Sequence, residues 1–436
     1  MTIHSAVATL CCGCDDPRHL ESMLSVAQAT AIARSLVAPV REMEPVLLGN
    51  AAGRVSARDI RAPRPMPFFD QSAMDGFAVR VADLSGEGPW RLAVLATVAA
   101  GDHALADEWA EGMAKRIYTG APVPAGADAV VMIEDCEDEG AFVTVGHRPR
   151  SGENIRRRGS DIGRDALLVA AGTGVEPRHV GLLAANGYTA LDVFRRPRVG
   201  IFSTGSELVS QAAPEEGRIF DANRPMLIAL AESAGSEVID LGIVDDDPAA
   251  TVRFFSRHAG EFDLLLSSGA VSAGGRDFIR PAFVEAGGTV HAWKVALKPG
   301  KPAFFGTLGK TAYFGLPGNP LSAFVSFELF VREQILRLGG ANQPKGGATR
   351  ALAGYSAHRK TGRTEYVPAR IASWSPEGLP VVEALGNGSS GTLHALGQAD
   401  GLVVIPAGQA QVAPGDPLGF LAFCPQVTGS SNGDFL

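Results

Sequence analysis

The stretch LLLSSGAVSAGGRD, residues 264–277, decides the fold of this chain. The mostly apolar run from Phe262 to Leu266 predicts a strand buried on both faces, as in a parallel sheet. The glycines that follow allow backbone N–H groups to approach an anion, and open α/β sheets hold ligands just past the carboxyl ends of their strands. We therefore expect a ligand loop here, with Asp277 opening the next helix, although an ordinary strand-to-helix turn would leave the same pattern.

Strands and helices alternate on both sides of this stretch. Beside the strand at 262–266, we expect strands at 198–203, 237–242 and 312–316, and helices at 177–185, 225–234, 277–286 and 321–338. Alternation of this kind predicts a parallel α/β sheet with helices on both faces. We place this central α/β domain at residues 195–342.

The regions around the α/β domain differ from it in composition and in the pattern of predicted strands and helices. Residues 1–17 resemble a flexible tail, and residues 18–63 together with 157–194 predict a small mixed α+β N-terminal domain. A proline-rich connector, APRPMPFF at 62–69, leads into short β-prone runs with Gly and Pro turns, which predict an inserted all-β domain at 64–156. Residues 346–426 predict a C-terminal β-barrel, so the expected fold class is α/β multidomain.

Composition narrows the classes of function. A chain of 436 residues with 46% hydrophobic residues can form several cores, and its net charge of −8 argues against nucleic acid as a partner. The sequence has neither a run long enough to span a membrane nor a signal-peptide pattern, so we expect a cytoplasmic protein without a membrane partner. Five cysteines, of which Cys11, Cys12 and Cys14 crowd the start, do not form a disulfide framework.

Three expected strand ends carry loops of the same character: STGSE at 203–207, SSGA at 267–270 and GLPGNP at 315–320. Because parallel strands end at one edge of their sheet, these loops should converge into a single pocket. The residues that we expect to contact a ligand there are Ser203, Thr204, Gly205, Ser268, Gly269, Ser272, Pro317, Gly318, Asn319 and Pro320.

Charged residues accompany these loops. Lys294, Lys298 and Lys301 share a proline-bounded segment that suits phosphate or another oxyanion, unless it is a solvated basic turn. Glu207, Asp246 and Asp277 follow strands of the same sheet and could hold Mg²⁺ together with a substrate phosphate. Lysines and carboxylates around one pocket indicate metal-assisted phosphate chemistry, whereas helix capping is the simpler role for each acid, Asp246 in particular.

Seven segments in register carry a resemblance to a known family. They are SAMDGFAV (72–79), TGAPVPAGADAVV (119–131), GENIRRRGSDI (152–162), FSTGSEL (202–208), DANR (221–224), LKPGKP (297–302) and GLPGNPLSA (315–323). Together they resemble the molybdopterin molybdenumtransferase family of the MoeA type, to which the E domain of gephyrin is related.

The resemblance implies an activity, its cofactors and its partners. The enzyme would insert molybdenum from molybdate into adenylylated molybdopterin and release AMP, with Mg²⁺ taking part. It also implies a Mog-like molybdopterin-binding α/β domain, and a homodimer whose pocket lies between the α/β domain of one chain and the β domain of the other. Other molybdenum-cofactor proteins and acceptor molybdoenzymes would be further partners. The functional positions of the family fall on Asp75, Thr119, Asp161, Glu207, Asp246, Asp277, Lys294 and Lys298.

The sequence departs from the family in the loop that follows the predicted strand at 262–266. The family loop usually reads Ser-Gly-Gly-Val-Ser-x-Gly-Glu-x-Asp-Tyr, whereas Ala270, Gly275 and Phe278 stand here for the second glycine, the glutamate and the tyrosine. The changes at Ala270 and Gly275, the second of which removes one acid near Asp277, motivate an alternative, a molybdopterin-binding scaffold with impaired catalysis. A second alternative is an adenylyltransferase that acts on molybdopterin with ATP, because related single-domain proteins share the α/β block.

Overall fold

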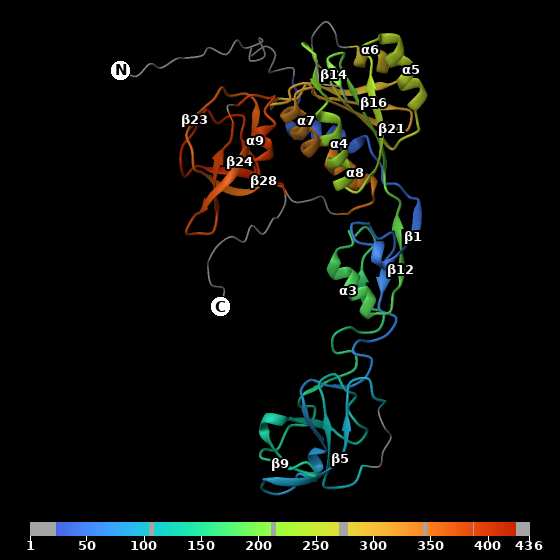
Figure 1. The fold of residues 1–436 in the computed structure, drawn as a ribbon, viewed down its shortest axis with the longest axis vertical. Coiled ribbons are helices and arrows are strands. Elements are labelled where there is room, and N and C mark those ends of the chain that lie inside the picture. Colours follow the sequence, from blue (N-terminus) through green and yellow to red (C-terminus); the bar gives the residue numbers. More distant parts are fainter. Residues whose placement is uncertain are drawn as a thin grey trace, which may run out of the picture.

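The computed structural model describes residues 23–103, 109–210, 215–269, 278–342, 347–386 and 388–423. The molecule is elongated (Figure 1): a β domain lies at one end, and the α/β domain and the C-terminal barrel lie together at the other. A small domain containing β1, β12 and α3 connects the two ends. Among the described residues, no helix combines the length and the apolar character that a membrane span requires.

The α/β domain is built on a six-stranded sheet with the order β16-β13-β17-β21-β20-β18. The first four strands are parallel, as predicted, and β18 runs in the same direction, but β20 is antiparallel to both of its neighbours, β21 and β18, so the sheet is mixed. The parallel arrangement of the four predicted strands is thus confirmed, and β20, which was not predicted as a strand, runs in the opposite direction. The reason is that β21 follows β20 through a tight turn at Gly309, and only antiparallel strands can be joined so closely. The strands are β13 Arg198–Thr204, β16 Glu237–Val244, β17 Leu264–Ser268, β18 Thr289–Trp293, β20 Phe304–Leu308 and β21 Thr311–Leu316.

Helices cover both faces of this sheet. On one face, Leu264 and Leu266 pack into a core shared with α2, α4, α7 and α8, and on the other Leu265 packs with Phe255 of α5 and Phe283 of α6. The alternation of Leu264, Leu265 and Leu266 between two cores explains why β17 is apolar throughout. The helices are α2 Val26–Ser35, α4 Asn223–Ser233, α5 Pro248–His258, α6 Ile279–Glu285, α7 Pro320–Ser326 and α8 Arg332–Leu338, with the π-helical turn η4 Phe327–Val331 between the last two.

The described part of the N-terminal region contains four further sheets besides helix α2. In the connecting domain, two antiparallel pairs, β1–β12 and β2–β11, pack with α3 around Leu183 and Val193. The β domain has a six-stranded sheet, β7-β4-β6-β5-β9-β8, whose core contains Phe77 and Val143, and a small pair β3–β10. The elements are β1 Met43–Leu47, η1 Leu48–Asn50, β2 Ile60–Arg61, β3 Gln71–Ser72, β4 Gly76–Val79, η2 Val81–Asp83, β5 Trp90–Val98, β6 Met113–Ile117, β7 Ala129–Met132, η3 Ile133–Asp135, β8 Cys136–Asp138, β9 Phe142–Val145, β10 Ile155–Arg156, β11 Leu167–Val169, α3 Pro177–Ala185 and β12 Ala190–Phe194.

The C-terminal domain is a small closed barrel, as predicted. Its five strands pair in the order β24-β25-β22-β28-β26, and β26 pairs back with β24 to close the ring. A short strand from the α/β domain, β19, adds to the outside of β24. The elements are β19 Leu297–Lys298, β22 Thr349–Ala353, β23 Ala357–His358, β24 Thr364–Trp374, β25 Pro380–Ala384, α9 His394–Gly397, β26 Gly401–Ile405, β27 Gln411–Val412 and β28 Pro417–Ala422; a further pair, β14 Leu208–Val209 and β15 Ile219–Phe220, belongs to the α/β domain.

Candidate functional site

The three predicted loops do converge at the carboxyl edge of the central sheet. Ser203 of β13 stands in register with Ser268 of β17, and Ser268 in register with Leu316 of β21. The loops that leave these neighbouring strands therefore start side by side. The chain passes from β13 to β16 on one side and then crosses to β17 on the other, so this is a topological switch point, where open α/β sheets bind ligands.

Glycine is required where two of these loops meet. Gly269 has φ +100°, and a Cβ placed there would lie 2.4 Å from the carbonyl oxygen of Thr204. The Gly269 N–H donates to the Leu316 carbonyl at 3.2 Å, so its backbone is held between the ends of β13 and β21. The predicted anion loop therefore begins with a close approach of backbone to backbone, which only glycine permits.

Asn223, at the start of α4, ties two of the loops together. Its side-chain amide nitrogen donates to the Ser268 hydroxyl at 2.7 Å and to the Gly318 carbonyl at 2.6 Å. Its amide oxygen, like the hydroxyls of Ser203 and Thr204, is buried without a hydrogen-bond partner among the described residues. Buried polar atoms are rarely left unpaired, so these three atoms mark a place at this edge where an ordered water or a ligand group would complete the hydrogen bonding. Asn223 belongs to the DANR segment, but its role was not expected from the sequence, because no local pattern reports a bridge between loops.

The C-terminal domain contacts the Pro317–Pro320 loop through hydrogen bonds. The Asn319 side chain donates to the Ser390 hydroxyl at 2.9 Å, and the Leu321 N–H donates to the Ser390 carbonyl at 3.2 Å. Ser390 was not expected from the sequence to lie at this pocket, because it belongs to a different domain. Pro317 is buried, Gly318 and Asn319 are exposed, and Pro320 begins α7.

The lysine segment adjoins the same edge. Lys294 has φ +70° and lies with its ammonium 4.1 Å from the centre of the Trp293 ring. Lys298 is an ion-pair partner of Glu365, with 2.8 Å between Nζ and the carboxylate. Lys301 is half-buried. The backbone of this segment is hydrogen-bonded to both Leu24 and the barrel, so the segment is held in place by its neighbours and is not a solvated basic turn.

The described carboxylates lie on exposed loops at this edge. Asp246 accepts the Ser206 N–H at 2.9 Å, while the N-cap of α5 is supplied by its neighbour Asp247. The capping role considered for Asp246 is therefore taken by the next residue. Glu207 is exposed, and its carboxylate folds so closely over Gly205 that a Cβ there would lie 2.5 Å from it. Asp277 and Ser272 lie outside the described residues, and in the described part no set of three His, Cys, Asp or Glu side chains is arranged to hold a metal ion.

Asp75 and Thr119 form a second polar cluster in the β domain. The Asp75 carboxylate accepts the Thr119 N–H at 2.7 Å and the Thr119 hydroxyl at 2.8 Å. These two bonds lower the pKa of Asp75 below its ordinary value, so the group is ionised at neutral pH. Asp161 is exposed. The sheet that carries this cluster lies at the opposite end of the molecule from the switch-point edge (Figure 1), so one chain does not bring them together.

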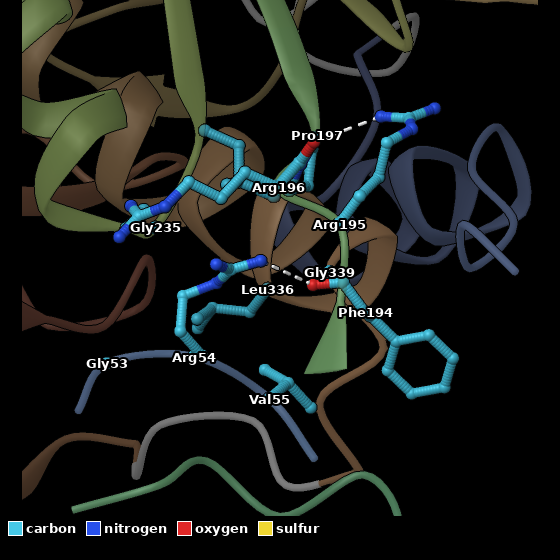
Figure 2. Close-up of a pocket in the computed structure, with 12 residues that line it drawn as sticks. Gly53, Arg54, Val55, Phe194, Arg195, Arg196, Pro197, Gly235, Leu336 and Gly339 are labelled. Carbon is cyan, nitrogen blue, oxygen red and sulfur yellow. Dashed lines mark hydrogen bonds between the residues drawn. The ribbon is translucent and has the colours of Figure 1, made fainter. Parts of the chain in front are cut away.

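A separate pocket lies where the connecting domain joins the α/β domain. Figure 2 shows Arg54 reaching across it to donate to the Phe194 carbonyl at 2.9 Å, and Arg195 donating to the Arg196 carbonyl at 3.0 Å. Its lining contains none of the residues predicted for the ligand site. Arg54 and Arg195, which both have backbone and carboxylate partners, make this a structural junction between domains.

Comparison with known proteins covers most of the chain. Three family models match in order: the MoeA N-terminal region (domains I and II) at residues 24–187, a probable molybdopterin-binding domain at 200–337, and the MoeA C-terminal region (domain IV) at 350–423. Among curated proteins, a molybdopterin molybdenumtransferase of Haemophilus influenzae is 39% identical over 74% of this chain and 80% of its own length. That of a Nostoc species is 35% identical over 86% and 87%.

The fold agrees with solved structures of the same kind. A molybdopterin biosynthesis MoeA protein from Pyrococcus horikoshii OT3 superposes with a TM-score of 0.78 at 28% identity, covering 92% of this chain and all of that one. The motifs, the order of the domains and the relatives of near full length agree. The chain belongs to the MoeA family and is a molybdopterin molybdenumtransferase of molybdenum cofactor biosynthesis.

Proposed function

We propose that this transferase takes adenylylated molybdopterin and molybdate, inserts molybdenum into the dithiolene and releases AMP, with Mg²⁺ taking part. The observation that carries the proposal is the meeting of three polar loops at the switch-point edge, beside Lys294 and Lys298. Both substrates are anions with several oxygens, and such groups are recognised by backbone N–H groups and by ammonium groups.

The residues of the proposed site would contact the substrates in different ways, according to the chemistry of their side chains. The unpaired hydroxyls of Ser203 and Thr204 and the amide oxygen of Asn223 would accept hydrogen bonds from the substrate, while the Gly269 and Gly318 loops would supply backbone contacts. Lys294 and Lys298 would bind phosphate and molybdate oxygens.

The described carboxylates suit a magnesium ion that is bound by the protein and the substrate together. Mg²⁺ is usually held by one or two carboxylates plus phosphate oxygens, and it keeps several waters. Glu207 and Asp246 are exposed at the strand ends, where a substrate phosphate would complete the coordination; we assign Asp277 the same role. When bound, the ion would neutralise phosphate charge, and without it these carboxylates would repel both anionic substrates.

We further propose that the working unit is a homodimer with shared sites. Asp75 and Thr119 lie in the β domain, remote from the switch-point edge of their own chain (Figure 1). Phe68, Phe69 and Met74, which are close to Asp75 in the sequence, are exposed by 46%, 44% and 43%. An apolar rim around a charged residue suits a protein interface, and the α/β domain of a second copy would bring the two halves of the site together.

The direct test is AMP release from adenylylated molybdopterin, with molybdate and Mg²⁺ varied independently. We expect release to require both, and to stop when EDTA removes the metal. Adenylylation of molybdopterin by ATP with this chain alone would instead support the adenylyltransferase alternative. Absence of AMP release under every condition would support the scaffold alternative.

Mixing two inactive variants tests the shared site. Asp75→Ala and Lys294→Ala should each abolish turnover. In a mixed dimer, one site carries both changes and the other carries neither. Random exchange of subunits should therefore restore about a quarter of wild-type activity. If each chain forms its own complete site, mixing will restore nothing.

A further inference from the structure

Lys298 is not carried by the α/β domain alone. Its two-residue strand β19 runs parallel to β24 of the C-terminal barrel, with Lys298 in register with Glu365. The Thr364 N–H donates to the Ala296 carbonyl at 3.1 Å and strengthens this pairing. The segment that carries the lysine is therefore an added strand of the barrel.

The side chain of Glu365 lies between two cations. One carboxylate oxygen is 2.8 Å from the Lys298 ammonium, and the other is 2.6 Å from Nε of Arg359. The side chains of Glu365 and Arg359 are only 11% and 4% exposed, whereas that of Lys298 is 40% exposed. A buried carboxylate is stable only with such partners, so Glu365 is the fixed member of the pair and Lys298 the accessible one.

Arg359 is itself held by the barrel. Besides Glu365, its guanidinium donates to the carbonyls of Pro406 at 2.9 Å, Gln409 at 2.7 Å and Arg363. The three charged groups sum to +1, since Arg359 offsets the charge of Glu365. A lone Lys298–Glu365 pair would be neutral and would attract an oxyanion weakly, whereas the trio keeps one positive charge and directs it through Lys298.

We infer that Glu365 is a positioning residue for the transfer reaction: it holds the ammonium of Lys298 where the oxyanion substrate binds, so that the C-terminal barrel sets the geometry of the α/β site. The inference rests on the proposed role of Lys298 as an anion ligand. It goes further in assigning a task to a buried acid of a different domain, one that makes no contact with substrate.

The test uses the full chain, with Glu365→Gln as the main variant. Removing this negative charge raises the sum of the trio from +1 to +2, so simple attraction would lower the KM for molybdate. Positioning predicts the opposite, a rise in KM of about tenfold with kcat changed much less. The matched control is Glu383→Gln, which makes the same chemical change in the exposed pair Arg370–Glu383 of the same barrel, and we expect it to leave KM unchanged.

A double-mutant cycle separates positioning from general stability. The dissociation constant for molybdate is measured by calorimetry for wild type, Lys298→Ala, Glu365→Gln and the double variant. We expect Glu365→Gln to have no further effect once Lys298 is absent, because it acts through that residue. If Glu365→Gln fails to fold, Glu365→Asp keeps the charge on a shorter arm and should give an intermediate rise in KM.

The outcomes distinguish the positioning role of Glu365 from the assignment of Lys298 to the anion site. An unchanged or lowered KM in both Glu365 variants, or a lowered melting temperature without a change in KM, overturns the positioning role. Equal effects of Glu365→Gln with and without Lys298 also overturn it. Wild-type affinity and turnover in Lys298→Ala would instead overturn the proposed site assignment itself.

Discussion

Replacing Gly269 by alanine should disrupt the edge where the ligand loops start. The residue has φ +100°, and its new Cβ would lie 2.4 Å from the Thr204 carbonyl oxygen and 3.1 Å from the Thr204 hydroxyl. Both obstacles belong to the neighbouring strand β13. Gly269 cannot move away freely, because its N–H is bonded to Leu316 on the other side.

The expected cost has two parts. Placing alanine at a positive φ costs about 1 kcal/mol. Forcing the ends of β13 and β17 apart to accommodate the methyl group costs about 1–3 kcal/mol, as for other overpacked sites. We therefore expect Gly269→Ala to destabilise the α/β domain by about 2–4 kcal/mol. Gly287→Ala is the matched control in the same domain, since Gly287 has φ +91° but nothing within 4 Å of its Cβ.

Hydrogen exchange of the β17 amides, together with AMP release, measures both consequences. Exchange reports the opening free energy of this strand and avoids the overlapping transitions of a multidomain chain. Gly287→Ala should lower that free energy by about 1 kcal/mol and retain activity, whereas Gly269→Ala should lower it further and lose most activity. If the two variants behave alike, the close contact with Thr204 does not constrain this edge, and glycine is not required at position 269.

Three further predictions follow from other contacts. Asn223→Ala removes both hydrogen bonds that connect two ligand loops. We therefore expect the free energy of unfolding to fall by about 1–3 kcal/mol and the KM for adenylylated molybdopterin to rise. An unchanged KM would exclude Asn223 from the site. Gln334 is fully buried, and its amide has no partner among the described residues, so Gln334→Leu should stabilise the fold by about 1–2 kcal/mol; a lowered melting temperature would contradict this. Burial raises the pKa of Asp263, but hydrogen bonds from the Arg195 side chain and a backbone N–H outweigh it and hold the pKa below 3.8. The ion pair thus contributes stability that is fully present above the ordinary pKa of a carboxyl group and is lost as the pH falls through the lowered pKa of Asp263. Asp263→Asn should therefore reduce the loss of stability in acid denaturation below about pH 4.

The sequence by itself determined the elements and the loops of the central domain. The predicted strands at 198–203 and 312–316 lie within β13 and β21, and in the connecting domain the predicted helix at 177–185 coincides with α3. These succeed because side-chain periodicity, proline and glycine report backbone conformation locally. The convergence of three loops also followed from sequence, because parallel strands must end at a common edge.

Only the tertiary structure decided which distant groups meet. Ser268 and the residue that bonds its hydroxyl, Asn223, are 45 positions apart, and Lys298 pairs with an acid on another domain. It also reversed β20, and it placed the β domain, which carries Asp75, at the other end of the molecule from the α/β domain. Hydrogen bonds and ion pairs of this kind depend on the order in which strands and domains pack. That order is set by the burial of whole faces, so no short stretch of sequence reports it.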